Sequence, residues 1–135
     1  MTDLPHPLTA ANIRYLLVIR ELDPQQQGAR SVDIAQRLGV SKPSVTTMTR
    51  SLVKLGLVEK ERYSAVFLTG SGRRMAEAYA VCCALLLRHL ARSLGFPNAD
   101  YRDAACLLLA ETPAELLPEL HRKLAQAQPP AAVRK

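Results

Sequence analysis

One apolar stripe at helical spacing lies between two glycines in the N-terminal half of the chain. Its members recur three or four residues apart, and they are Val45, Met48, Leu52 and Leu55. This spacing is typical of an α-helix that buries one face against a core. Ser41 is suited to cap the start of the helix, and Pro43 lies in its first turn, where the missing N–H of proline removes no helix bond. Gly56 is expected to end the helix.

The segments around this helix predict further elements in a definite order. Residues 9–22 are expected to form a helix, and residues 31–38 a shorter one that Ser31 caps and Gly39 ends. Residues 57–69 hold two β-prone runs. Helix, glycine-containing turn, helix and β-hairpin is the order of a winged helix-turn-helix.

The C-terminal half predicts further helices. A long helix is expected over residues 69–94 and a second over 100–110. A third is expected to start at a capping box over residues 112–115 and to reach about residue 125. Residues 128–135 hold two prolines and are predicted to be a disordered tail.

Two segments of the C-terminal half, residues 81–87 and 106–110, are apolar nearly all round. A helix without a polar face must be covered on every side, and a chain of this size cannot do so alone. We therefore expect a mainly α fold with a small β-hairpin. It comprises a winged helix-turn-helix DNA-binding domain over residues 1–74 and a helical dimerisation domain over residues 75–127. A two-fold homodimer would place two recognition helices on successive major grooves of a roughly palindromic operator.

Charge is distributed unevenly along the 135-residue chain. The net charge is +6, and residues 1–75 hold 11 Lys/Arg against 6 Asp/Glu, whereas residues 76–135 hold 7 against 6. The N-terminal half is therefore expected to face a polyanion such as double-stranded DNA. The N-terminus shows no export signal, and the longest apolar run, residues 78–87, is too short for a bilayer. Three cysteines do not make a disulfide framework, so we expect a cytoplasmic protein with no membrane partner.

The outward side of the third helix carries side chains suited to reading DNA. Short hydroxyl side chains let a helix approach base edges, threonine methyls can contact the thymine methyl, and cations suit phosphates or guanine. The helix N-terminus also offers free N–H groups to a phosphate. Arg73 and Arg74 are explained equally well as flanking phosphate contacts or as solubilising residues. We expect DNA contacts from Ser41, Lys42, Pro43, Ser44, Thr46, Thr47, Arg50, Lys60 and Arg62.

Nothing in the sequence indicates an enzyme. There is no Ser/His/Asp set, no phosphate-binding glycine loop and no pair of carboxylates on one helix face. A sequence-specific DNA-binding regulator has still to be distinguished from a winged-helix module that binds a protein partner. A steep salt dependence without sequence preference would favour the module.

Three stretches of the chain follow a dense pattern. They are YLLVIREL at residues 15–22, VDIAQRLGVSKPSVTTMTRSLVKLGLVE at 32–59 and LTGSGRR at 68–74. The pattern resembles the metal-dependent repressors of the diphtheria toxin repressor and manganese transport regulator family, from about residue 15 to residue 120. The chain stops before the extra C-terminal domain of the iron-responsive members, so it resembles the shorter, manganese-type architecture. The resemblance implies a dimeric repressor that binds a metal in the helices after the wing.

Most metal ligands of that family have no counterpart in this chain. Carried over position by position, they fall on Arg14, Leu17, Cys83, Leu87, Arg102, Cys106, Leu109 and Ala110. Only Cys83 and Cys106 keep donor atoms, and an oxygen- and imidazole-rich site for Mn²⁺ or Fe²⁺ cannot be built from them. The resemblance thus implies the fold and the DNA reading, without manganese or iron sensing.

Three interpretations of Cys82, Cys83 and Cys106 stay open. They fill a helical core as small apolar residues; or Cys83 and Cys106 form a soft-metal site or a thiol redox switch; or the dimer core encloses a small-molecule pocket. Apart from a soft transition metal, the sequence indicates no cofactor. The sequence therefore predicts a homodimeric DNA-binding transcriptional repressor. A soft-metal- or thiol-responsive regulator and the protein-binding module are the alternatives.

Overall fold

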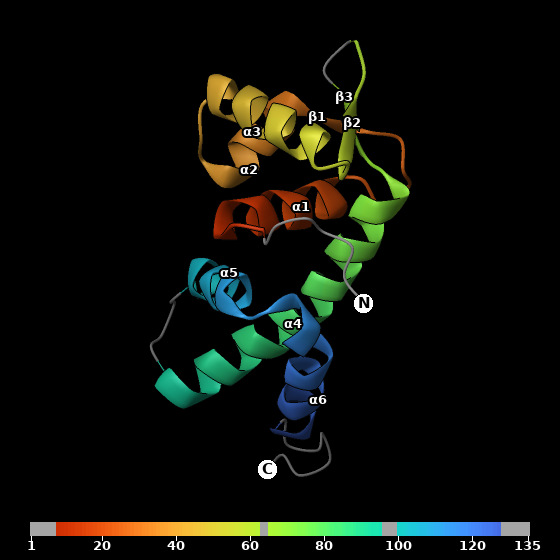
Figure 1. Cartoon of the computed structure of the whole chain (residues 1–135). Helices are drawn as coiled ribbons and strands as arrows, with labels where there is room; N and C mark the ends of the chain where they lie inside the picture. Colours follow the sequence, from red (N-terminus) through yellow and green to blue (C-terminus); the bar gives the residue numbers. More distant parts are fainter. Residues whose placement is uncertain (1–7, 63–64, 96–99, 128–135) are drawn as a thin grey trace. The chain divides into compact units, whose positions relative to one another are not determined.

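The computed structural model describes residues 8–62, 65–95 and 100–127, and the chain divides into two compact units. The first unit spans Ala11–Ala78, and the second comprises the described residues from Tyr79 onward together with those before Ala11. Helix α4, Gly70–Leu94, begins in the first unit and ends in the second (Figure 1).

The first unit combines helices with a small antiparallel sheet, in which the strand order is β1-β3-β2. Its elements before α4 are α1 (Ala10–Leu22), β1 (Ala29–Arg30), α2 (Ser31–Leu38), α3 (Lys42–Lys54), β2 (Val58–Lys60) and β3 (Ala65–Leu68). This arrangement confirms the mainly α fold with an N-terminal winged helix-turn-helix. The sheet has one strand more than the predicted hairpin, because β1 pairs with the start of β3.

Side chains from every layer of the first unit are fully buried. They include Ile13, Leu16 and Ile19 of α1, Ile34 of α2, Val45 and Leu52 of α3, and Leu57, Val58 and Val66 around the sheet. Burying a side chain of this size contributes roughly 1.5–3 kcal/mol. The predicted stripe of α3 therefore faces inward, with Met48 and Leu55 half-buried at its margin. Asn12 donates a hydrogen bond from Nδ2 to the sulfur of Met48 at 3.1 Å, which links α1 to α3.

The ends of α2 and α3 follow the local rules for helix capping with one exception. Ser41 caps α3, since its Oγ accepts a hydrogen bond from the Ser44 N–H at 3.2 Å. Gly39 ends α2 in the left-handed conformation, with φ of 70°. The predicted cap at Ser31 was wrong, because Ser31 is the first helical residue and Arg30 is the N-cap. Arg30 is extended and pairs with Ala65 in the sheet, so α2 starts directly from a strand.

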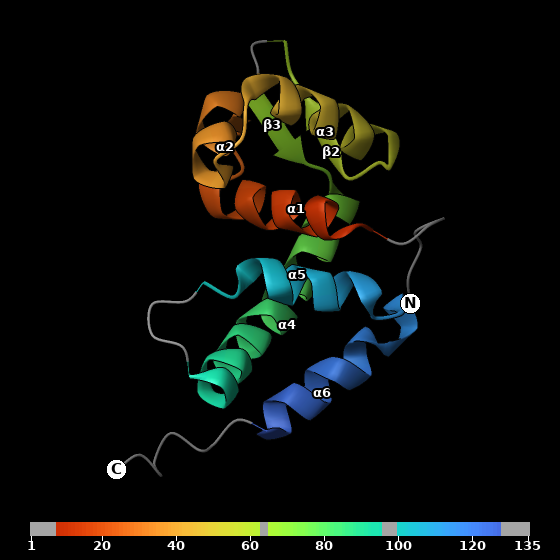
Figure 2. The ribbon, with the colours of Figure 1, turned by 90° about the vertical axis from the view of Figure 1, so that its left-hand side faces the viewer.

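The second unit is helical, as Figure 2 shows. After the C-terminal part of α4 come α5 (Arg102–Glu111), the short 3-10 helix η1 (Ala114–Leu116) and α6 (Leu117–Ala127). The predicted capping box was wrong: Thr112 Oγ1 donates to the Leu108 carbonyl at 2.7 Å, and Pro113 precedes the 3-10 turn without a side-chain cap. None of the described helices has the length and apolar character needed to cross a membrane. The predicted disordered tail, residues 128–135, lies outside the described residues.

Candidate nucleic-acid interface

Helix α3 presents a continuous polar surface opposite its buried stripe. The structure exposes all seven residues predicted to read DNA from this helix and its cap. They are Ser41, Lys42, Pro43, Ser44, Thr46, Thr47 and Arg50. Lys54, in the last turn, is exposed as well. Only short or flexible side chains therefore stand between the helix backbone and an approaching ligand.

The cations of α3 are not engaged by carboxylates. The helix contains no Asp or Glu, and within the described residues Lys42, Arg50 and Lys54 form no ion pair. Two arginines elsewhere in the first unit are paired with carboxylates. Arg20 Nε lies 3.1 Å from a carboxylate oxygen of Glu77, and Arg37 lies 2.9 Å from Glu21. The hydrogen bond from Arg20 lowers the pKa of Glu77 below its ordinary value. Uncompensated positive charge thus gathers on α3.

The wing, formed by β2 and β3, separates its charges between two faces. Lys60 is paired with Val66, which is fully buried, so Lys60 extends from the core-facing side of the sheet. Glu59 is paired with Phe67 on the opposite face. Arg62 is exposed just beyond β2. Lys60 therefore lies on the side of the sheet that faces the packed helices, and Glu59 lies on the other side.

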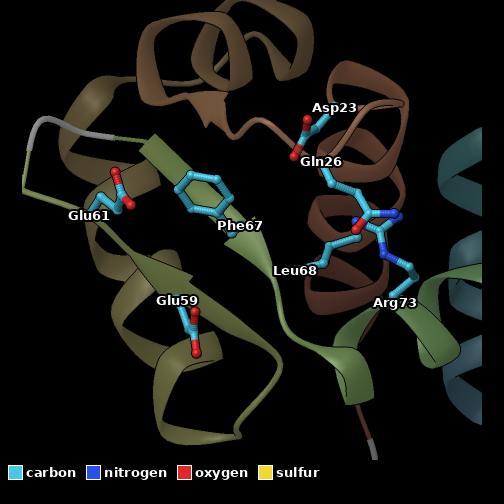
Figure 3. Close-up of a pocket in the computed structure, with 7 residues that line it drawn as sticks. All are labelled: Asp23, Gln26, Glu59, Glu61, Phe67, Leu68 and Arg73. Atoms are coloured by element: carbon cyan, nitrogen blue, oxygen red, sulfur yellow. The ribbon is translucent and has the colours of Figure 1, made fainter.

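Glu59 and Phe67 of that opposite face line an open pocket of about 230 Å³ (Figure 3). Its lining contains three carboxylates and one guanidinium, and it consists of Asp23, Gln26, Glu59, Glu61, Phe67, Leu68 and Arg73. The Asp23 carboxylate stabilises the loop after α1, because its two oxygens accept hydrogen bonds from the N–H groups of Gln27 and Gly28 at 2.6 and 2.8 Å. The acidic lining disfavours phosphates at this pocket, whereas α3 presents exposed cations.

The two arginines after the wing differ in exposure. Arg74 is exposed and its Nη2 lies 3.4 Å from Ser71 Oγ, whereas Arg73 is half-buried and lines the pocket. Neither residue belongs to the surface of α3.

The positions to which the resemblance carries the family's metal ligands hold few donor groups suited to manganese or iron. On α1 these positions hold Arg14 and Leu17, and on α4 they hold Cys83 and Leu87. On α5 they hold Arg102, Cys106, Leu109 and Ala110. A guanidinium repels a metal cation, and leucine and alanine have no donor atoms. Two sulfur atoms remain, and Mn²⁺ and Fe²⁺ prefer oxygen and nitrogen ligands. Within the described residues, no group of three or more His, Cys, Asp or Glu side chains could hold an ion.

The three cysteines are free thiols buried in the second unit. Cys82 Sγ lies 4.0 Å from the Leu117 carbonyl oxygen. Burial, together with the neighbouring Cys83, raises the pKa of the Cys82 thiol above its ordinary value. The thiolate form that binds soft metals or attacks oxidants is thereby disfavoured at Cys82.

One inward residue of α3 was missed by the sequence reasoning. Thr49 is 2% exposed and lies between Val45 and Leu52 on the buried side of the helix. Thr49 follows Val45 by four residues and precedes Leu52 by three, a spacing that predicts a buried position. Its polar side chain instead suggested an exposed one.

Comparison with known proteins agrees with this geometry. Residues 8–66 match the iron dependent repressor family, N-terminal DNA binding domain. Over 63 residues the chain is 41% identical to the transcriptional regulator MntR of Escherichia coli O6:H1. The matched stretch covers 47% of this chain and 41% of that protein.

Solved structures extend the similarity beyond that domain. A manganese-dependent transcriptional repressor in complex with manganese is 31% identical, with a TM-score of 0.65, over 87% of this chain and 54% of that one. The manganese regulator SloR has a TM-score of 0.69 at 23% identity, over 89% of this chain and 54% of that one, and so supports the fold alone. The chain spans about half the length of the relatives it matches. Residues 8–66 are therefore similar to the N-terminal DNA binding domain of the iron dependent repressor family, and the chain is similar in fold to manganese regulators of known structure.

Proposed function

We propose that this protein is a cytoplasmic, sequence-specific DNA-binding transcriptional regulator, acting as a repressor. The observation that carries the proposal is the outer face of α3, where hydroxyl groups are exposed together with three cations that form no ion pair within the described part of the chain. The relatives are named as transcriptional regulators and as a repressor, which supports the same assignment. Ser41 to Arg50 would read the operator, and Lys60 and Arg62 of the wing would hold its backbone.

The regulator would work as a homodimer through its second unit. Among the described residues, five of the seven large apolar side chains that are exposed belong to this unit. They are Val81, Leu94, Leu107, Leu108 and Leu116. Exposed apolar side chains at this density on α4, α5 and η1 favour burial against a second copy of the chain. The operator would then be roughly palindromic, with half-sites one helical turn apart, about 34 Å.

DNA binding would not require manganese or iron. The relatives are manganese regulators, but the donor chemistry at the corresponding positions of this chain does not suit these ions. The buried, protonated state favoured for Cys82 also argues against a soft-metal site that includes it. The second unit would therefore hold its dimer geometry by apolar packing alone.

The test is selection of bound duplexes from a random DNA library by the full-length protein, followed by fluorescence anisotropy on the winning duplex and a scrambled one. Both steps contain chelator and reductant, and a parallel series contains Mn²⁺ or Fe²⁺. We expect enrichment of a palindromic sequence and an unchanged affinity in the metal series. Binding without sequence preference, with a steep salt dependence, would instead identify the protein-binding module. Sequence-specific binding that appears only with Mn²⁺ or Fe²⁺ would refute the metal-independent part.

The melting temperature gives a readout that does not depend on DNA. We expect it to be the same in chelator and in excess Mn²⁺, since a ligand that binds the folded state would raise it. A rise with increasing Mn²⁺ would reveal a site for the ion.

A further inference from the structure

We call the line along α3 that lies directly opposite its buried residues the central ridge of the exposed side. With about 100° between successive residues, Val45, Thr49 and Leu52 point to one side. The residues on the directly opposite line recur at spacings of four, three and four, and they are Pro43, Thr47, Arg50 and Lys54. All four are exposed. Thr46 and Ser44 lie roughly 70° and 90° to either side of this line.

The cations of α3 are ordered along the helix by type. Lys42 is the first residue and Lys54 the last, while Arg50 lies near the middle. A helix of 13 residues is about 20 Å long, whereas the major groove is about 12 Å wide. A recognition helix lies in the groove, and because this one is longer than the groove is wide, its ends can reach the sugar-phosphate walls while residues between them face the bases. In such a complex the terminal lysines would be near phosphates and Arg50 would be near base edges.

The side chain of Arg50 suits this central place. A guanidinium offers a planar fork of donors that matches O6 and N7 of guanine, which is the commonest specific contact in the major groove. No carboxylate of the described residues pairs with Arg50, and α3 holds none of its own, so the fork is available. Lysine is a flexible point charge, which suits phosphate contact without base preference.

We propose that Arg50 reads one guanine in each operator half-site, while Lys42 and Lys54 contact phosphates on opposite walls of the groove. Thr47 and Pro43, further along the ridge, place a methyl group and an apolar ring where thymine methyls can be contacted. This inference rests on the proposed DNA-binding function and adds a base-reading residue to it.

The experiment repeats the random-library selection with the full-length wild type and with Arg50→Gln. Glutamine pairs with adenine in the same geometry in which arginine pairs with guanine. We expect a single guanine position in each half-site of the wild-type sequence, and its loss or replacement by adenine in the variant. On matched duplexes, replacing this guanine by adenine should lower the affinity of the wild type by roughly ten- to hundredfold. Arg74→Gln, the same change at an exposed arginine outside α3, should leave every base preference intact.

Lys54→Gln separates the two kinds of contact. We expect it to weaken binding to all duplexes equally and to reduce the salt dependence by about one charge per protomer, with base preferences unchanged. The inference is overturned if Arg50→Gln keeps the wild-type guanine preference, or if it weakens all duplexes equally as a phosphate contact would. A wild type that selects no sequence at all would overturn the proposed function itself, which is a different outcome. Circular dichroism of each variant checks that the fold is retained.

Discussion

Gly72 packs so tightly against Leu57 that a β-carbon at position 72 would overlap the Leu57 carbonyl oxygen. Thr69 produces this contact. Its N–H donates to the Leu57 carbonyl at 3.1 Å, and its Oγ1 donates to the Gly56 carbonyl at 2.7 Å while accepting from the Gly72 N–H at 2.9 Å. The first turn of α4 is thereby fixed to the turn that follows α3. A backbone approach of this kind leaves room for glycine only.

We expect Gly72→Ala to destabilise the protein. The added methyl group meets main-chain atoms, which cannot move aside as a flexible side chain can, so overpacking should cost about 1–3 kcal/mol of unfolding free energy. Urea denaturation measures the loss. Gly70→Ala is the matched control at the start of the same helix, since its nearest neighbour would be the end of the Arg74 side chain at 3.6 Å. Equal stability of the two variants would contradict the close contact between Gly72 and Leu57.

Leu107→Lys should dissociate the proposed homodimer. Leu107 is 57% exposed on α5, so the lysine is tolerated in a single chain but would be buried in an apolar interface. Analytical ultracentrifugation should give twice the 14.8 kDa chain mass for the wild type and a value near the chain mass for the variant. Val40→Lys places the same charge at an exposed apolar residue of the first unit and should leave the dimer intact. If the Leu107→Lys protein keeps the mass of the wild-type dimer, the dimer interface does not include this part of α5.

The cysteines should resist alkylation in the folded protein. Cys82, Cys83 and Cys106 are 3%, 6% and 1% exposed, and burial raises the pKa of Cys82, which lowers its reactive thiolate fraction. Mass spectrometry after iodoacetamide treatment should show labelling at least about tenfold slower in buffer than in denaturant. Rapid labelling of Cys83 or Cys106 without denaturant would revive the thiol-switch interpretation.

Stability should fall at alkaline pH. Burial raises the pKa of Tyr79 above its ordinary value of 10.0 and that of Cys82 above 9.0. Between the unfolded and folded pKa values the unfolded chain releases these protons first, so the free energy of unfolding decreases as pH rises. The full contribution is present below about pH 9 and is lost as the pH passes through the folded-state values. Melting temperatures from pH 7 to 10.5 measure the effect. Tyr79→Phe should show a shallower decline, and an identical decline would exclude Tyr79 as a cause.

Local sequence determined much of this protein. The Ser41 cap, the left-handed Gly39 and the stripe at Val45 and Leu52 each depend on residues only a few positions apart. Such short-range patterns suffice for choosing which face of a helix is polar, although the helix starts that they predicted at Ser31 and at the capping box were wrong. The exposed candidate residues of α3 follow directly from them, and their role in reading DNA stays a prediction.

Tertiary structure decided what depends on distant partners. Strand β1 has two residues and no pattern of its own, and it exists because Ala65 and Val66 offer backbone hydrogen bonds to it. Thr49 is polar by type but buried by position. In both cases groups distant in the sequence decide the outcome, and no local pattern contains them.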